Sequence, residues 1–247
     1  MILKVLYFFK LLFAAFSFIC LFYSVMEFTY FISFPKEETG KTHEEIWFEG
    51  SWVLLKDMAL LVLFIVQHSA MASERFKSCL SKFKLDDMSR CIYTTATAAS
   101  LLFIMKSWLT STIVLWHLNL SYKPLSWIYF GVHSVAWIII YVANICTDVT
   151  ELLGLKQIYY SIINLPEPNQ RKSHRLRKLT SHMRHPSFLG FLMVFWFYPT
   201  MTLDRLLLGT ILTLYMYIAW NTDGEDYNYQ KYMYQRKYHE LERLHTY

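Results

Sequence analysis

Long apolar runs separated by short polar segments dominate the chain. A hydrocarbon core about 30 Å thick needs roughly 20 apolar residues per helix, and the longer runs meet that requirement. They predict transmembrane spans at 5–34, 52–71, 91–116 and 127–147. The first run is too long for the core of a signal peptide, and no small-residue cleavage site follows it, so we expect an uncleaved first span.

The last apolar block differs from the others because Pro199 and the polar residues after it divide it in two. Its first arm, 187–198, would be about 18 Å long as a helix, which is short for a span. We therefore expect arms 187–198 and 203–220 to form a short helical hairpin within the bundle. The whole pattern predicts an all-α polytopic membrane protein with about six transmembrane helices.

The composition agrees with this interpretation. Of the 247 residues, 55% are hydrophobic and only 17% are charged, whereas an average soluble domain has roughly a quarter charged residues. The low polarity excludes a disordered chain. The four cysteines form no Cys-x-x-Cys pair, so neither a zinc ribbon nor a disulfide framework is indicated. We interpret residues 1–247 as a single integral membrane domain.

Basic residues define the expected orientation, since membrane proteins keep lysine-rich and arginine-rich loops on the cytosolic side. They gather in the loops 72–90 and 148–186 and in the tail 221–247, whereas an acidic run at 37–49 lies on the opposite side. The pattern places both termini in the cytosol or, in a nuclear membrane, in the nucleoplasm. Topology explains the basic loops, so no specific nucleic-acid binding is predicted.

Charged residues inside a span are costly and mark a partner or a cavity. Lys106 lies near the middle of the third predicted span, and its expected partners on neighbouring helices are Asp57 and Glu27. A structural ion pair and a functional site both fit this pattern.

The nine histidines form no His-Glu-x-x-His motif and no close pair with carboxylates, so no metal site is predicted. His68 and His133 lie within predicted spans, where a lone histidine is more often a hydrogen-bonded bundle residue than a ligand. The sequence has no P-loop, no Gly-rich dinucleotide turn and no Ser-His-Asp signature. It therefore assigns no catalytic residue.

Polar residues also flank the expected hairpin. Arg184 and His185 precede it, and Gly190 lies in its first arm, where it permits close helix approach. An acidic cluster follows the hairpin and consists of Asp223, Glu225 and Asp226. Because a hairpin brings its ends together, these groups fit either an amphiphilic cofactor with an amine and a carboxylate or a cluster of salt bridges.

The Arg184-His185-Pro186 segment, followed by Gly190, a short hydrophobic hairpin and an acidic pair, resembles the isoprenylcysteine carboxyl methyltransferase superfamily. The resemblance implies an S-adenosylmethionine site whose residues here are Arg184, His185, Gly190, Asp223, Glu225, Asp226 and Tyr238. The chain departs from that pattern at Gly224, where the active enzymes carry a second glutamate. In the Gly-x-x-Tyr-x-x-Tyr motif of the tail only Tyr238 is kept, so the implied cofactor site is vestigial.

A closer resemblance, to the nurim family in the branch that also holds methanethiol methyltransferase, covers most of the chain. It is carried by the segments 67–72, 148–160, 199–208 and 235–237. The signature residues of the first two segments are Gln67, His68, Asp148, Glu151, Gly154, Lys156 and Gln157.

This resemblance implies a multi-pass resident of the nuclear inner membrane with a structural, non-catalytic role and no cofactor. Its expected partners are membrane lipids and nuclear-envelope or lamina proteins. The alternative is an S-adenosylmethionine-dependent methyltransferase that acts on a lipophilic or small thiol substrate. A third class, binding of a lipid or sterol within the bundle, is allowed by the 18% aromatic content.

Overall fold

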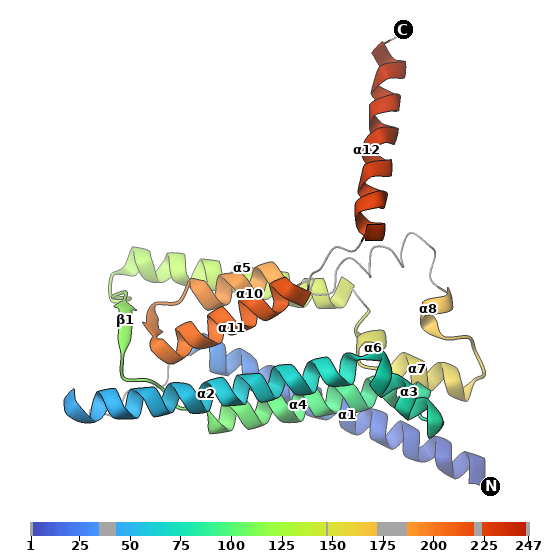
Figure 1. The fold of residues 1–247 in the computed structure, drawn as a ribbon, viewed down its shortest axis with the longest axis horizontal. Helices are drawn as coiled ribbons and strands as arrows, with labels where there is room; N and C mark the ends of the chain where they lie inside the picture. The colour runs from blue at the N-terminus through green and yellow to red at the C-terminus, as the bar shows by residue number, and fades with distance from the viewer. Residues whose placement is uncertain (1, 35–42, 147, 172–186, 220–223, 246–247) are drawn as a thin grey trace.

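The computed structural model describes residues 2–34, 43–146, 148–171, 187–219 and 224–245, and it is mostly helical (Figure 1). The elements in chain order are α1 (Ile2–Ser33), α2 (His43–Ala72), α3 (Glu74–Lys82), η1 (Asp86–Met88), α4 (Ser89–Ser107), β1 (Val114–His117), α5 (Lys123–Cys146), α6 (Val149–Leu152), α7 (Leu155–Ile162), α8 (Pro168–Arg171), α10 (Phe188–Trp196), β2 (Thr200–Thr202), α11 (Leu203–Ala219) and α12 (Gly224–His245).

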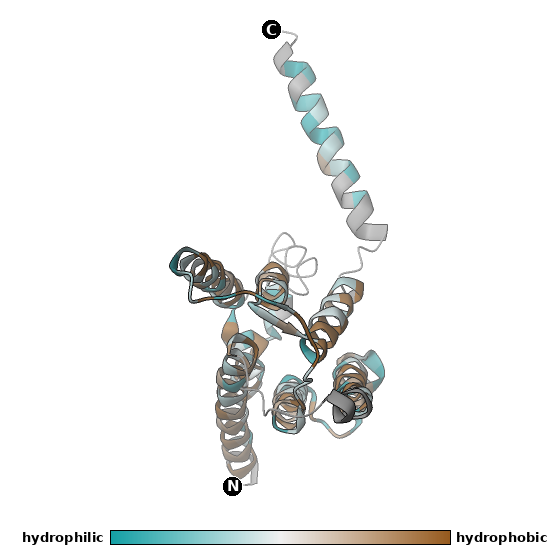
Figure 2. Cartoon of the chain, turned by 90° about the vertical axis from the view of Figure 1, so that its left-hand side faces the viewer, coloured by the Kyte–Doolittle hydropathy of each residue, from teal (hydrophilic) through white to brown (hydrophobic). Residues whose placement is uncertain are grey.

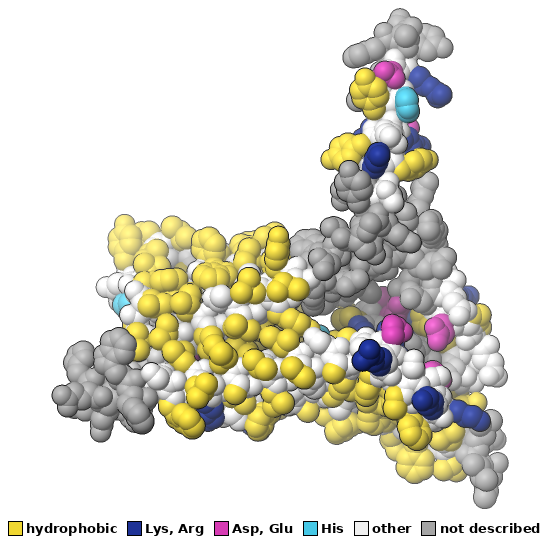
Figure 3. Space-filling model, viewed as in Figure 1, with side chains coloured by type: hydrophobic (Ala, Val, Ile, Leu, Met, Phe, Trp, Pro, Cys, Tyr) yellow, Lys and Arg dark blue, Asp and Glu magenta, His cyan; other side chains and the backbone are white. Residues whose placement is uncertain are grey.

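Four of these helical segments are long and apolar enough to cross a membrane. They are Val5–Ser33 in α1, Gly50–Ala72 in α2, Asp86–Ser107 in η1 and α4, and Lys123–Cys146 in α5. Large apolar side chains such as Phe9 and Ile19 point outward, and hydrophobic side chains cover most of the bundle face seen in Figure 3. An apolar exterior of this kind is what a bilayer solvates. The chain is therefore a helical multi-pass membrane protein.

The helices α1 and α4 run parallel along their length, held by small polar residues. Ser17 donates through its hydroxyl to the carbonyl oxygen of Cys91 at 3.2 Å, and one level further on Ser24 donates to that of Ala98 at 3.3 Å. Small residues let helix backbones approach closely where hydrophobic driving force between helices is absent. The helix α2 packs against the same α4 and also against α11.

A second layer is made by α5, α10 and α11. The helix α10 packs on α5 and on α11, and the ribbons of α10 and α11 lie side by side in Figure 1. Side chains from both layers meet in one core that includes Leu61, Phe64, Ile104, Val194 and Leu208. The two arms of the expected hairpin correspond to α10 and α11, and each begins or ends within two residues of its predicted bounds.

A two-stranded sheet, which the sequence did not predict, joins the bundle at one end. The strands β1 and β2 pair antiparallel, with Val114 opposite Thr202 and His117 opposite Thr200, and a bulge interrupts the ladder between Val114 and Trp116. We call this the sheet end of the bundle and the opposite end, with α3, α6 and α7, the loop end (Figure 1). The fold is thus mostly rather than entirely helical.

The third predicted span is too long at its C-terminal end. The helix α4 ends at Ser107, and the residues after it run in extended form toward β1, whereas the sequence analysis continued the span to residue 116. The apolar run continues because Val114, Leu115 and Trp116 belong to a strand. Hydrophobicity alone does not distinguish these two conformations over a few residues.

The helix α12 differs from the rest in position and character. It points away from the bundle (Figure 1) and is more hydrophilic than the bundle helices (Figure 2). Its described side chains are exposed, as for Tyr234 and Tyr238.

The contact between α5 and α10 at Gly190 yields a stability prediction. A Cβ atom there would lie 2.5 Å from Cγ1 of Ile140 and 2.7 Å from the carbonyl oxygen of Ala136. We expect Gly190→Ala to lower the free energy of unfolding by about 1–3 kcal/mol, because the backbone oxygen cannot move aside. The measurement is the melting temperature of the purified protein in detergent.

Gly131→Ala is the matched control, because it lies on the same helix α5 and a Cβ atom there would meet nothing within 4 Å. Alanine is favoured over glycine in a helix by about 1 kcal/mol, so this variant should be at least as stable as the wild type. Equal melting temperatures for both variants would contradict the packing assigned to Gly190.

Candidate functional site

The residues proposed for a cofactor are not brought together within the described part of the chain. Arg184, His185 and Asp223 lie outside the described residues, and so do the side chains of Glu225 and Asp226. The two described residues of this set, Gly190 and Tyr238, lie in different parts of the structure. Gly190 faces Ile140 in the α5–α10 contact, and Tyr238 is 63% exposed on α12.

The signature residues of α2 form a polar cluster between helices. The Nε2 atom of His68 lies 2.6 Å from the hydroxyl of Tyr93, and its Nδ1 atom lies 3.3 Å from Oγ1 of Thr97. The preceding residue of α2, Gln67, accepts a hydrogen bond from the hydroxyl of Ser100 at 2.9 Å. Tyr215 of α11 contacts the edge of the His68 ring, 6.1 Å between centroids. His68 is thus a hydrogen-bonded bundle residue that links α2, α4 and α11.

The signature residues after α5 fold into a compact turn around Asp148. This residue has a φ of 66° and caps α6, accepting a hydrogen bond from the backbone N–H of Glu151. Its carboxylate also accepts hydrogen bonds of 2.7 Å from the side chains of Thr150 and Lys156. The Lys156 ammonium and the Thr150 hydroxyl hold the pKa of Asp148 at about 2. In return, the carboxylate raises the pKa of Lys156.

Gly154 docks this turn onto the start of α4. Its φ is 87°, and a Cβ atom would lie 2.8 Å from the backbone nitrogen of Cys91, so both the conformation and the space require glycine. Arg90 donates through Nε to the carbonyl oxygen of Leu152 at 2.9 Å. Gln157 closes the turn by donating to the carbonyl oxygen of Glu151 at 3.0 Å. The signature residues therefore serve turns and contacts between helices, with Glu151 contributing through its backbone groups.

Asp204, in the first turn of α11, is a deeply buried charged residue of the sheet end, with 2% exposure. Its two carboxylate oxygens each accept a hydrogen bond of 2.9 Å, one from the indole N–H of Trp108 and one from the backbone N–H of Ser111. Asp204 thus fixes the extended segment that follows α4. The backbone of this segment forms no helical hydrogen bonds of its own. The neighbouring span residue Asp57 acts similarly, accepting from the backbone N–H of Leu109 at 3.2 Å.

Arg205, the next residue, caps the end of α1. It donates hydrogen bonds of 3.0–3.1 Å to the carbonyl oxygens of Phe31, Ile32 and Phe34. The last carbonyls of a helix lack intrahelical partners, and a buried backbone group without a partner is costly. The guanidinium also lies 3.8 Å from the centroid of the Tyr198 ring. The sequence analysis included Asp204 and Arg205 in the polar interruption of the last apolar block and in the segment 199–208 of the nurim resemblance, but it assigned neither residue a role.

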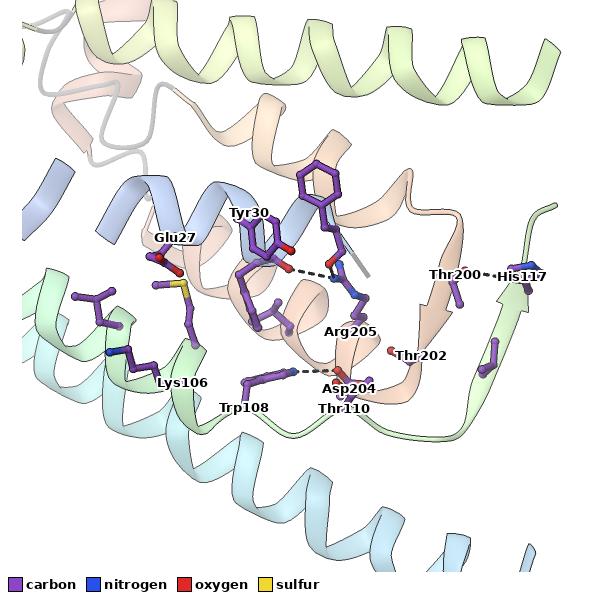
Figure 4. Close-up of a pocket in the computed structure, with 16 residues that line it drawn as sticks. Glu27, Tyr30, Lys106, Trp108, Thr110, His117, Thr200, Thr202, Asp204 and Arg205 are labelled. Carbon is purple, nitrogen blue, oxygen red and sulfur yellow. Dashed lines mark hydrogen bonds between the residues drawn. The ribbon is translucent and has the colours of Figure 1, made fainter. Parts of the chain in front are cut away.

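A cavity of about 1180 Å³ opens beside this cluster, between the ends of α1 and α4, the two strands and the start of α11 (Figure 4). Asp204, Arg205, Thr200 and His117 lie toward one end, and Glu27 and Lys106 lie at the other. His117 is bonded across the sheet to Oγ1 of Thr200 at 2.9 Å.

The ion pair considered for Lys106 is not formed with either expected partner. Asp57 is occupied by the backbone of Leu109, and Glu27 lines the same cavity as Lys106 without an ion pair to it. The reason is the early end of α4 at Ser107, which places Lys106 at the helix terminus with an exposed side chain rather than at mid-span.

Two other features bear on function, the capacity for metal binding and the histidine within α5. Within the part of the chain that the structure covers, no group of three or more His, Cys, Asp or Glu residues is placed to hold a metal ion. His133 lies 2.8 Å through Nε2 from the carbonyl oxygen of Phe197. It is a second hydrogen-bonded bundle histidine.

These features define a helical multi-pass membrane protein whose intramembrane polar residues mainly bond the helices to one another. Comparison with known proteins gives the family. A nurim homolog of Drosophila pseudoobscura pseudoobscura is 41% identical over 187 residues, which cover 75% of this chain and 74% of that protein. Nurim of Mus musculus and nurim of Homo sapiens are each 39% identical over 193 residues, covering 76% of this chain and 72% of theirs. The chain belongs to the nurim family. No family model and no solved structure matches it.

The Asp204 cluster predicts a measurable coupling. We expect Asp204→Asn to lower the free energy of unfolding by about 1–3 kcal/mol, because the amide turns an N–H group toward one of the two buried donors. In a Trp108→Phe background, which removes the indole donor, the same change should cost less. The melting temperatures of the four proteins in detergent give the coupling.

Glu240→Gln on α12, where the Glu240 side chain is 59% exposed, should leave the melting temperature unchanged. If Asp204→Asn lowers the free energy of unfolding as much in the Trp108→Phe background as in the wild type, the hydrogen bond from the Trp108 indole is not the source of the stabilisation by Asp204.

The Asp148 turn predicts a pH dependence. The pKa of Asp148 falls from 3.8 to about 2 in the folded turn, so its carboxylate stabilises the turn fully above about pH 4. That stabilisation is lost as the pH falls from about 4 to about 2. We expect Asp148→Asn to increase cleavage by pepsin within 148–162 near pH 4.5, and the difference from wild type to vanish near pH 2.

Glu74→Gln is the control, because the Glu74–Lys77 pair is exposed and exposed pairs contribute little. Equal cleavage of wild type and Asp148→Asn near pH 4.5 would refute the stabilising role of the carboxylate.

Proposed function

We propose that this chain is a structural, non-catalytic resident of the nuclear inner membrane, as the name of its nurim relatives suggests. The observation that carries the proposal is the use of the signature residues. Gln67, His68, Asp148 and Gly154 bond or pack helices and turns against one another. Residues retained for chemistry would instead be expected to converge on a site open to substrate.

The topology that we infer has six membrane segments. The helix α10 starts at the loop end and approaches the sheet, and α11 returns from β2 to the loop end (Figure 1). With nine and 17 residues, these two helices are shorter than a usual span, and they would cross the bilayer as a pair supported by α5 and α2. The basic loops then lie in the nucleoplasm or cytosol with both termini, and the sheet end lies in the lumen.

Localisation tests this proposal directly. The full chain with a small fluorescent tag, produced in animal cells, should give a continuous nuclear rim that persists after extraction with non-ionic detergent. Selective permeabilisation of the plasma membrane should leave a tag at either terminus inaccessible to antibody until the nuclear envelope is opened. A multi-pass protein of the endoplasmic reticulum with the same tag is the control. A diffuse reticular pattern for this chain would contradict the proposal.

The methyltransferase alternative is tested by ligand binding. Arg184 and His185 would hold S-adenosylmethionine or its product, with Asp223, Glu225 or Asp226 on the amine. For a structural protein we expect no binding of S-adenosylhomocysteine at millimolar concentration in calorimetry on folded, detergent-solubilised protein. Micromolar binding that His185→Ala abolishes would instead establish a working cofactor site.

A further inference from the structure

We propose that the sheet-end cavity binds a phospholipid with a primary amine in its headgroup. Lys106 contacts the phosphate, and Glu27 contacts the ammonium group. The proposal rests on the charges, walls and position of the cavity. It does not depend on which cellular membrane the protein occupies.

The two charges at one end of the cavity have no ion-pair partner among the described residues. Glu27 is half-buried and Lys106 exposed, and both line the same end of the cavity (Figure 4). The Glu27 carboxylate accepts a hydrogen bond from the hydroxyl of Tyr23, which is neutral and leaves the negative charge without an opposite charge beside it. At the other end, Asp204 and Arg205 are held by protein hydrogen bonds. Charges at membrane depth need a partner, and two opposite charges that do not pair with each other suit a ligand that carries both.

The walls of the cavity fit an amphiphile rather than a purely polar metabolite. In addition to its polar residues, the cavity is lined by apolar and aromatic side chains, among them Tyr30, Phe31, Phe34, Leu102, Met105 and Leu208. Its volume of about 1180 Å³ exceeds the range of roughly 300–1,000 Å³ typical of small-molecule pockets. A headgroup with the upper part of its acyl chains would use both the polar end and the apolar wall.

The depth of the two charges also matches a lipid headgroup. Since α1 and α4 run parallel, both helices end at the sheet side. Glu27 lies six residues before the end of α1 at Ser33, about 9 Å along the helix axis. Lys106 is the next-to-last residue of α4. Both charges therefore lie near one boundary of the hydrocarbon region, where the phosphate and amine of a lipid are found.

A primary amine is favoured over choline by hydrogen-bonding chemistry. An ammonium group offers three N–H donors and can form charge-assisted bonds to the Glu27 carboxylate. A quaternary ammonium has none and is bound instead by an aromatic cage. Trp108, the largest aromatic side chain of the cavity, is fixed by its bond to Asp204 and by edge contact with Phe31.

Lipid retention measured by native mass spectrometry tests the proposal. The full-length protein is purified, stripped of lipid in detergent, and mixed with equal amounts of phosphatidylethanolamine and phosphatidylcholine that have identical acyl chains. We expect the wild type to retain phosphatidylethanolamine about tenfold more than phosphatidylcholine, the size of one charge-assisted hydrogen bond. Equal retention of the two lipids would overturn the proposal.

Two variants separate the two headgroup contacts. Glu27→Gln should remove the preference between the lipids while total retention through Lys106 persists, whereas Lys106→Met should reduce retention of both. Lys123→Met, which removes an exposed lysine that does not line the cavity, is the matched control and should behave as wild type. If Lys106→Met does not fold, the Glu27→Gln result decides alone, and an unchanged preference there would refute the assignment of the ammonium contact.

A soluble ligand with the same headgroup distinguishes a lipid from a metabolite. Free phosphoethanolamine at millimolar concentration should not displace the bound lipid, because it lacks the acyl chains that the apolar wall contacts. Displacement would show that the cavity recognises the headgroup alone and would contradict the assignment of a lipid.

Discussion

The sheet end of this protein depends on adjacent residues of opposite charge, Asp204 and Arg205. One binds the extended segment that leaves α4, and the other binds the last carbonyls of α1. Both are needed because a helix end leaves backbone groups that its own helix does not satisfy, and such groups are costly when they are buried without a partner. By placing both residues in the first turn of α11, the chain joins three helices at one point and allows a short sheet to form beside them.

The same principle recurs at the loop end with different residues. There the carboxylate of Asp148 and the conformation of Gly154 fold the turn after α5 and dock it against the start of α4. In the bundle itself, His68 and Gln67 form hydrogen bonds that join α2 to α4. Because lipid gives helices little hydrophobic reason to associate, such bonds specify which helices are neighbours, and this explains why a largely apolar chain contains specific polar residues at these positions.

The cavity between Glu27 and Lys106 is an exception to this pattern. Most of the buried polar residues discussed above bond to protein groups, whereas the half-buried Glu27 and the exposed Lys106 line an open space and form no ion pair with each other. A structural role in a membrane and a bound lipid are compatible, since a lipid that bridges α1 and α4 would complete the packing where α4 ends early. With the proposed lipid bound, the polar residues of this protein would serve two purposes, joining helices and contacting the bilayer.

The sequence alone determined the membrane class, the four long helices and the family, because apolar runs of span length and local signatures are properties of contiguous residues. It also located the two arms of the hairpin, since Pro199 and the charges after it interrupt the apolar block. The end of α4, the β1–β2 sheet and the roles of Asp204 and Arg205 were decided only by the tertiary structure. Each depends on groups about 80 to 170 positions apart in the chain, and no local pattern of hydrophobicity records which distant backbone group a buried charge will satisfy.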